Sequence, residues 1–247
     1  MEQTNSFPSL YQKDEAKANI VSAEMQTNEI LKILLHDIKN PMSSLTGYLG
    51  LISMMAKSLD PKPKQYLMSS VWSSNEMAAL CKNIEDSISI ETNHFPLKLE
   101  PLQISPILQK NIEKLNPIAT FFQKKIFFET IECPPCIQGD KILIERMIYT
   151  LINHSLQHCP DTKEVKISLK KQDPFLLLEI EDEGSAILKE HLEKYFDKYF
   201  SVHCGKGVRR PRGWDAYFCS LVARLHGGKI AVHQVEKRQI FSVFLPF

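Results

Sequence analysis

The sequence predicts an α+β protein in which a long helical hairpin precedes a two-layer α/β sandwich. In the first third of the chain, apolar residues recur at alternating steps of three and four, which is typical of helix bundles. The breaker cluster at residues 60–63 (Asp-Pro-Lys-Pro) divides that third into two long segments. From about residue 95 onward, strand-like runs alternate with helical periods, which indicates a mixed α/β domain.

The first segment carries two interleaved apolar rows at sevenfold spacing. The rows are Leu31, Ile38, Leu45 and Ile52, and Leu35, Met42 and Leu49. We assign residues 1–21 to a polar tail and residues 22–94 to a hairpin of two amphipathic helices. One hairpin cannot bury two wide apolar stripes on its own. We therefore predict that two copies pair as a homodimer with a four-helix bundle.

One turn of the first helix combines three polar side chains that can take part in a reaction. His36 and Asn40 lie off the apolar rows and four residues apart, so they share one solvent-facing side of the helix, with Asp37 beside them. An exposed imidazole next to a carboxylate can accept a phosphoryl group, and a neighbouring amide can hold a water for its removal. Pro41 removes a backbone hydrogen bond at a cost of about 3 kcal/mol, so we expect a bend here.

Residues 95–247 are expected to form the sandwich. Ser105 and Pro106 predict a helix start, Asp140 predicts a helix N-cap, and Gly227 with Gly228 predicts a helix end. The predicted helices cover 105–119, 140–158, 186–197 and 214–226, and the predicted strands cover 125–132, 164–171, 175–182, 229–235 and 239–246.

Residues 36–41 (His-Asp-Ile-Lys-Asn-Pro) resemble the phosphoacceptor box of two-component histidine kinases. The resemblance implies that His36 carries the phosphoryl group, that Asp37 is the base for autophosphorylation, and that Asn40 supports phosphatase action. Residues 99–247 resemble the ATP-binding domain of the same family. The motifs that carry this second resemblance are Gly139-Asp140, Arg146, Pro160, Asp182-Glu183-Gly184, the aromatic pairs at 195–196 and 199–200, and His226-Gly227-Gly228.

The second resemblance implies a nucleotide site formed by Asp182, Gly184, Asn153 and Gly213. The sequence departs from the family pattern at the place where magnesium binds. His154 occupies the position of the family's magnesium-binding asparagine, and Asn153 is displaced by one residue, or about 100° around a helix. Imidazole is a poor ligand for magnesium, so the predicted site has one oxygen ligand fewer for the metal.

The two glycine-rich boxes have also lost glycines. Ala186 replaces a glycine in the first box, and the lid box at residues 211–216 keeps only Gly213. Glycines let backbone N–H groups approach phosphate oxygens, whereas the carboxylate of Asp215 would repel a triphosphate. We therefore predict a degenerate ATP site and expect ATP and Mg²⁺ as cofactors only if this divergent site still works.

Bulk composition narrows the class of protein. The net charge of +1 predicts no nucleic-acid partner, and no apolar run approaches the roughly 20 residues that cross a bilayer. We expect no membrane insertion, a cytoplasmic location and a signal that arrives from an upstream sensor protein.

No metal site is predicted, because His154 and His158 lack a second ligand pair. Cys133 and Cys136 have thioredoxin-like spacing but no helix N-terminus after the first cysteine.

We predict a two-component signalling protein in which His36 exchanges a phosphoryl group with the aspartate of a response-regulator receiver domain. Little or no ATP-dependent autokinase activity is expected. A first alternative is an active histidine kinase, in which the basic residues of 206–212 hold the phosphates by charge. A second alternative is a non-catalytic scaffold that regulates a partner kinase. The intact His-Asp-x-x-Asn turn argues against scaffolding alone, because binding does not require that chemistry.

Overall fold

The computed structural model describes the backbone of residues 10–56, 60–121, 123–158, 164–183, 189–198, 200, 202–204, 208–210, 213–236 and 238–247. Side chains are described for the same residues except 10–26, 61, 158, 189, 202–204 and 208–210. The chain forms two compact units, residues 1–88 and residues 89–247.

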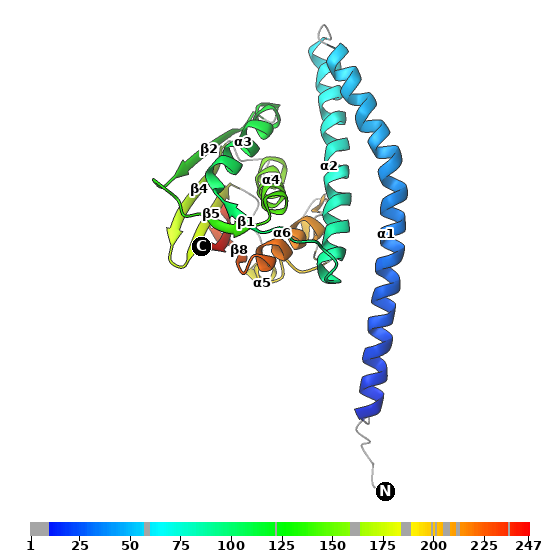
Figure 1. Cartoon of the computed structure of the whole chain (residues 1–247). Coiled ribbons are helices and arrows are strands. Elements are labelled where there is room, and N and C mark those ends of the chain that lie inside the picture. The colour runs from blue at the N-terminus through cyan, green and yellow to red at the C-terminus, as the bar shows by residue number, and fades with distance from the viewer. Residues whose placement is uncertain are drawn as a thin grey trace. The chain divides into compact units, whose positions relative to one another are not determined.

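The helices α1 (Leu10–Met55) and α2 (Pro61–Glu91) form the predicted hairpin (Figure 1). α1 begins within the segment 1–21 that we assigned to a tail, because residues 10–21 are rich in lysine, glutamate, glutamine and alanine, which favour helix. α2 begins inside the predicted breaker cluster. Proline fits the first position of a helix, and the backbone N–H of Lys64 donates to the carbonyl of Asp60 at 3.1 Å.

The two helices of the first unit pack through one of the two predicted apolar rows. Leu35 and Met42 are buried against Cys81 and Ile84 of α2. The other row stays on the surface of the single chain. Ile38, Leu45 and Ile52 are 44%, 48% and 50% exposed. The hairpin therefore buries one apolar stripe and leaves the second one uncovered.

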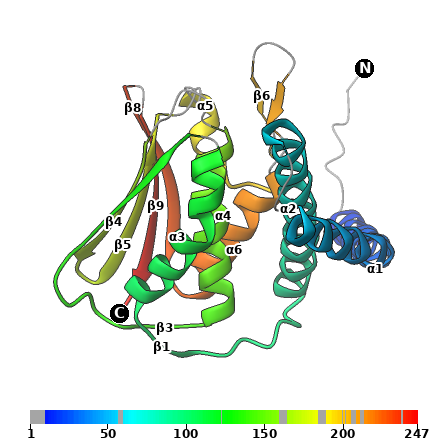
Figure 2. The same ribbon diagram turned by 90° about the horizontal axis from the view of Figure 1, so that it is seen from above.

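The second unit contains a five-stranded sheet with strand order β2-β4-β5-β9-β8. The strands are β2 (Lys125–Thr130), β4 (Glu164–Gln172), β5 (Phe175–Asp182), β8 (Lys229–Val235) and β9 (Arg238–Pro246). β2 pairs with β4 in parallel, and the other neighbours pair antiparallel. The helices α3 (Ile104–Phe121), α4 (Lys141–His158) and α6 (Gly213–Leu225) lie on one face of this sheet (Figure 2).

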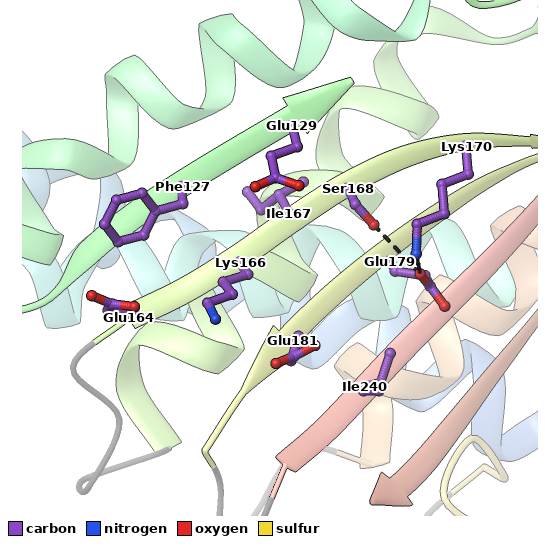
Figure 3. Close-up of a pocket in the computed structure, with 10 residues that line it drawn as sticks. All are labelled: Phe127, Glu129, Glu164, Lys166, Ile167, Ser168, Lys170, Glu179, Glu181 and Ile240. Atoms are coloured by element: carbon purple, nitrogen blue, oxygen red, sulfur yellow. Dashed lines mark hydrogen bonds and ion pairs between the residues drawn. The ribbon is translucent and has the colours of Figure 1, made fainter. Parts of the chain in front are cut away.

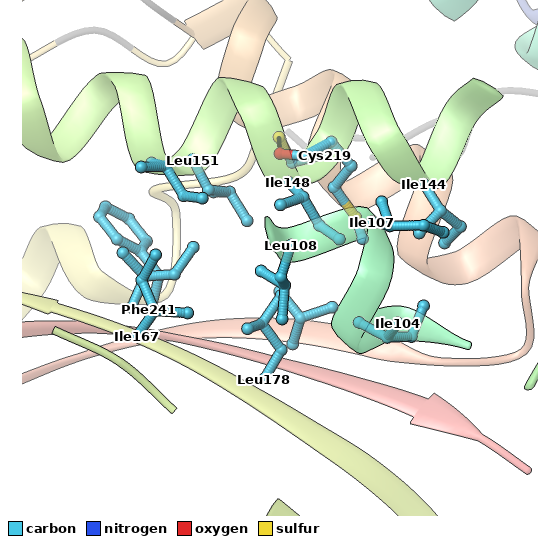
Figure 4. Packing of buried hydrophobic residues seen from close by; sticks show 14 of the residues in the cluster. Ile104, Ile107, Leu108, Ile144, Ile148, Leu151, Ile167, Leu178, Cys219 and Phe241 are labelled. Atoms are coloured by element: carbon cyan, nitrogen blue, oxygen red, sulfur yellow. Dashed lines mark hydrogen bonds between the residues drawn. The ribbon is translucent and has the colours of Figure 1, made fainter. Parts of the chain in front are cut away.

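The hydrophobic core of the second unit lies between these helices and the sheet. Figure 4 shows α3 and α4 residues facing residues of β4, β5 and β9. Fully buried examples are Ile104, Leu108, Ile144, Ile148, Ile167, Leu178, Ile180, Phe218 and Phe241. The predicted fold class, a helical hairpin followed by a two-layer α/β domain, is confirmed.

Asp140 fixes the start of α4 as an N-cap. Its Oδ1 atom accepts the backbone N–H of Ile142 at 3.0 Å and that of Leu143 at 3.1 Å, while Oδ2 accepts the N–H of Lys98. These bonds satisfy donors that a helix N-terminus otherwise leaves unpaired. The cap was predicted from the sequence, and it orients the helix that carries Asn153 and His154.

The helix expected at 186–197 is much shorter in the structure. α5 covers Lys189–Leu192 only, and residues 193–198 form turns. Tyr195 and Phe196 instead pack against Phe241 of β9, so tertiary contacts override the helical period. Four short strands were not predicted: β1 (Glu100–Leu102), β3 (Ile137–Gly139), β6 (Val202–Cys204) and β7 (Val208–Arg210). Three residues carry too little alternation to indicate a strand.

Candidate functional site

The predicted phosphoacceptor turn lies on the exposed side of α1. The side chains of His36 and Asp37 are 75% and 69% exposed, and Asn40 is exposed on the same helix. The Nδ1 atom of His36 lies 3.2 Å from the Oδ1 atom of Asp37. A carboxylate beside Nδ1 favours the tautomer that is protonated at Nδ1. The lone pair of Nε2 is then available as a nucleophile.

Residues within and after this turn hold α1 against α2. The ammonium group of Lys39 pairs with Glu85, and the hydroxyls of Thr46 and Ser74 are 2.6 Å apart. Burial would raise the pKa of Glu85, but hydrogen bonds from Lys39 and Lys82 outweigh it and lower that pKa. The phosphoacceptor turn therefore sits on a helix whose inner side is fixed by an ion pair and a hydroxyl pair.

In the second unit, polar residues form one row across the end of the sheet. Asp182 of β5 is paired in register with Gln239 of β9, which is paired with Gln234 of β8. The preceding inward row along the same strands is apolar: Ile180, Phe241 and Val232. Asp182 and Gln239 are both almost completely buried. Burying polar groups at this end of an apolar face is costly, which marks it as a candidate ligand-binding edge.

His154 is bonded to an aromatic side chain instead of facing open space. The hydroxyl of Tyr195 lies 2.9 Å from the Nε2 atom of His154. The imidazole also makes an edge-to-face contact with Phe241, with ring centroids 5.4 Å apart. Asn153, displaced by one residue, is buried. Asn153 and His154 of α4 therefore have different surroundings, as expected from their rotation around the helix.

The space beside His154 is very small. A cavity of about 20 Å³ is bounded mainly by Thr150, His154, Tyr195, Asp215, Cys219 and Phe241. This volume is enough for about one water molecule. Pockets that hold small-molecule ligands are typically about 300–1,000 Å³. Within the described residues, the cavity beside His154 is therefore far smaller than a typical ligand pocket.

The remaining predicted nucleotide residues divide into two groups. Gly213 begins α6, and a Cβ atom there would lie 2.4 Å from the carbonyl oxygen of Phe200, so its glycine is required for backbone packing. Gly184, Ala186 and the side chains of the basic run 206–212 lie outside the described residues. The structure gives no geometry for them.

A larger hollow lies on the sheet face that the three helices leave uncovered (Figure 3). Its volume is about 470 Å³, and its walls come from β2, β4, β5 and β9. Its charged residues largely pair across strands: Lys170 lies 2.5 Å from Glu179, and Arg238 lies 3.1 Å from Glu181. This pattern is that of a solvated sheet face, and none of the predicted site residues lies in it.

Within the described segments, no group of three or more His, Cys, Asp or Glu residues is arranged to hold a metal ion. Cys133 and Cys136 are both exposed free thiols. None of the described helices has an apolar stretch that could span a bilayer.

Comparison with known families agrees with this two-part organisation. Residues 26–93 match the His Kinase A (phospho-acceptor) domain, and residues 139–247 match the histidine kinase-, DNA gyrase B- and HSP90-like ATPase family. The two matches follow each other along the chain. The chain belongs to the histidine kinase family. The two matched regions agree with the resemblances that were given for residues 36–41 and 99–247.

Two curated relatives of this kinase-family chain are named as sensors. The sensor protein KdpD of Clostridium acetobutylicum is 25% identical over 95% of the chain and 26% of the relative. The sensor histidine kinase HprS of Escherichia coli is 24% identical over 86% of the chain and 46% of the relative. The chain thus spans about half or less of the length of these relatives.

Solved histidine kinases share its fold. Full-length ShkA in complex with AMPPNP gives a TM-score of 0.62 at 16% identity, over 89% of this chain and 46% of ShkA. Histidine kinase AdeS of Acinetobacter baumannii gives a TM-score of 0.58 at 17% identity, over 85% of this chain and 97% of AdeS. Histidine kinase ThkA in complex with the response regulator protein TrrA gives a TM-score of 0.57 at 18% identity, over 98% of this chain and 68% of ThkA.

Two features of the nucleotide region were not predicted. Tyr195 was expected only as a member of the aromatic pair at 195–196, and Gln239 belonged to no predicted motif. Tyr195 contacts His154 across 41 residues of sequence, so no local pattern indicates the bond. Gln239 interrupts the inward alternation of β9, and this polar residue at an apolar position was a signal that the sequence did contain.

Proposed function

We propose that this chain is a dimeric phosphorelay protein in which His36 exchanges a phosphoryl group with a receiver-domain aspartate. The observation that carries the proposal is the exposed imidazole with its Nδ1 atom beside the Asp37 carboxylate. In the forward step, Nε2 of His36 attacks the phosphorus of the aspartyl phosphate. The N–P bond forms as the P–O bond breaks, and the aspartate carboxylate leaves. The reverse step regenerates the aspartyl phosphate.

Asn40 is proposed to assist removal of the phosphoryl group from the receiver. It lies one helical turn after His36 on the same exposed side, where an amide can orient an attacking water. Small residues follow on α1, at Ser43, Ser44 and Gly47, and all three are exposed. Small side chains allow the close approach of a partner backbone. A receiver domain is the partner that this surface fits.

Dimerisation is proposed from the uncovered apolar row. Ile38, Leu45 and Ile52 are spaced by seven residues and remain about half exposed in the single chain. Burying such a row is worth about 25 cal/mol per Å² of apolar surface. A second copy of the hairpin would cover these residues and complete a four-helix bundle. His36 lies off the row, so it stays accessible to a receiver in the dimer.

We further propose that ATP-dependent autophosphorylation is weak. The described residues do not fit Mg²⁺ and a triphosphate well. His154 is bonded to Tyr195, the cavity beside it holds about one water, and Asp215 adds a carboxylate to its wall. Asp182 and Gln239, the buried polar residues that are paired in register at the end of the sheet, are compatible with nucleotide recognition there. These observations support a degenerate site, in which His36 receives its phosphoryl group from a protein partner.

One assay separates the candidate functions. The purified chain is incubated with labelled ATP and Mg²⁺ and, separately, with a phosphorylated receiver. Label that arrives on His36 only from the receiver supports the relay, whereas rapid label from ATP supports an active kinase. Receiver dephosphorylation without label on the chain supports phosphatase action.

Two variants make the assay specific. His36→Ala should abolish label on the chain, and Asn40→Ala should chiefly slow dephosphorylation. His94→Ala is the matched control, because His94 is an exposed histidine outside the turn. No transfer and no dephosphorylation with any receiver tested would leave the scaffold as the explanation.

A further inference from the structure

We propose that the hydrogen bond between Tyr195 and His154 is a latch that keeps the cavity between α4 and α6 too small for a ligand, and that releasing it admits a nucleotide. The inference rests on the proposed function, since it gives a physical cause for poor use of ATP. It concerns the second unit, whereas the phosphorelay proposal depends on His36 in the first. The two proposals can therefore fail separately.

The latch consists of one hydrogen bond and a group of aromatic contacts. The hydroxyl of Tyr195 lies 2.9 Å from Nε2 of His154. The rings of both residues pack against Phe241, with centroid distances of 5.7 Å for Tyr195 and 5.4 Å for His154. Phe196 packs against Tyr195 at 5.2 Å. These contacts join a turn, a helix and a strand around the same small cavity.

The segment that carries Tyr195 has little regular structure of its own. Residues 193–198 are turns that follow a four-residue helix. The backbone N–H of Tyr195 donates to Leu192 at a long 3.4 Å, and that of Asp197 donates to Lys194 at 3.0 Å. No long helix must break for this turn to move, and its restraints include the aromatic contacts, the His154 bond and the ion pair of Lys198 with Glu91 at 2.8 Å. Such a segment can move as a hinge.

Opening would change both the size and the chemistry of the cavity. The phenol ring of Tyr195 forms part of its wall, so outward movement of residues 193–198 would enlarge it beyond about 20 Å³. The exposed walls would then include the apolar side chains of Phe241 and Leu151 and the hydroxyl of Thr150. The freed imidazole of His154 would face the same space. A flat heteroaromatic ring fits between such walls.

The expected size of the effect follows from a two-state equilibrium. If only the open state binds, the apparent Kd equals the intrinsic Kd divided by the open fraction. Removing one neutral hydrogen bond of ordinary strength raises a small open fraction about fivefold. Removing the ring as well should raise it further, because the contacts with Phe241 and Phe196 are also lost.

The test measures binding of a fluorescent adenine nucleotide to the full chain, with and without Mg²⁺. Tyr195→Phe removes the hydroxyl and keeps the ring, and Tyr195→Ala removes both. Tyr66→Phe is the matched control, because Tyr66 is exposed on α2 and takes the same chemical change. We expect binding about fivefold tighter for Tyr195→Phe, tighter still for Tyr195→Ala, and unchanged for Tyr66→Phe.

A second readout reports on the latch itself. In Tyr195→Phe, the ¹⁵N signal of His154 Nε2 should shift, and amide hydrogen exchange at 193–198 should accelerate. Circular dichroism and thermal melting establish that each variant is folded. The proposal is overturned if both folded Tyr195 variants bind no more tightly than the wild type. It is equally overturned if the exchange at 193–198 is unchanged, because the segment is then held by something else.

Discussion

The Nε2 atom of His226 accepts a hydrogen bond from the backbone N–H of Asp140 at 2.9 Å. The other ring nitrogen, Nδ1, donates to the carbonyl of Val222 at 2.7 Å. The buried imidazole thus joins the end of α6 to the start of α4. This arrangement requires the neutral ring, because a protonated Nε2 cannot accept the Asp140 bond.

Acidification should therefore weaken the second unit through His226. Burial lowers the pKa of His226, against smaller opposing effects of the Val222 carbonyl and the Asp140 charge. The unfolded chain binds the proton more readily than the folded chain, so the contribution of His226 is complete above about pH 6.5. It is lost as the pH falls through the lower pKa of the folded state.

Unfolding free energies at pH 8 and pH 5.5 check this expectation. The difference between the two values should shrink in His226→Gln relative to the wild type. His233→Gln is the control, because His233 is exposed on β8 and should leave the difference unchanged. An equal pH dependence in the wild type and His226→Gln would show that other groups control it.

The Asp140 cap gives a second prediction. Asp140→Ala should cost about 1–2 kcal/mol of stability, because the N–H groups of Ile142 and Leu143 lose their acceptor. Asp140→Asn retains a side-chain oxygen at the cap and should cost much less. The amide exchange of Ile142 and Leu143 is the direct readout. Unchanged protection of both amides in Asp140→Ala would mean that the cap contributes little.

The cap and the latch also show how far the sequence could predict the structure. Asp140 lies next to the helix that it caps, so a local pattern revealed it, and the same holds for the Gly227 helix end and the sevenfold rows of α1. His226 and Asp140 are 86 residues apart, and Tyr195 and His154 are 41 apart. Such pairs form only when the chain folds, so residue types and spacing do not specify them.

Replacing Gln239 should stabilise the protein. Gln239 is completely buried, and its amide nitrogen and oxygen have no hydrogen-bond partner within the described residues. An amide without a partner in an apolar interior costs about 1–3 kcal/mol. Gln239→Leu keeps a similar volume and removes the polar atoms. We expect the free energy of unfolding to rise by about 1 kcal/mol in chemical denaturation.

Gln234→Leu is the matched control for this change. Gln234 is half-buried on the neighbouring strand, and its Nε2 atom donates to the carbonyl of Glu236 at 3.2 Å. The same substitution there removes a bond, so it should give no gain in stability. A destabilised Gln239→Leu would indicate that the wild-type amide has a partner in solution.

The uncovered row of α1 gives the last prediction, which concerns assembly. The double variant Ile38→Glu and Leu45→Glu should be monomeric, because dimerisation would bury two carboxylates among apolar side chains. Both residues are about half exposed in the single chain, so the hairpin itself tolerates the change, and Leu35 and Met42 remain in its core. Sedimentation equilibrium measures the mass, and Leu99→Glu, at an exposed leucine of the second unit, should remain dimeric. A double variant that still sediments as a dimer would place the interface on another face of the chain.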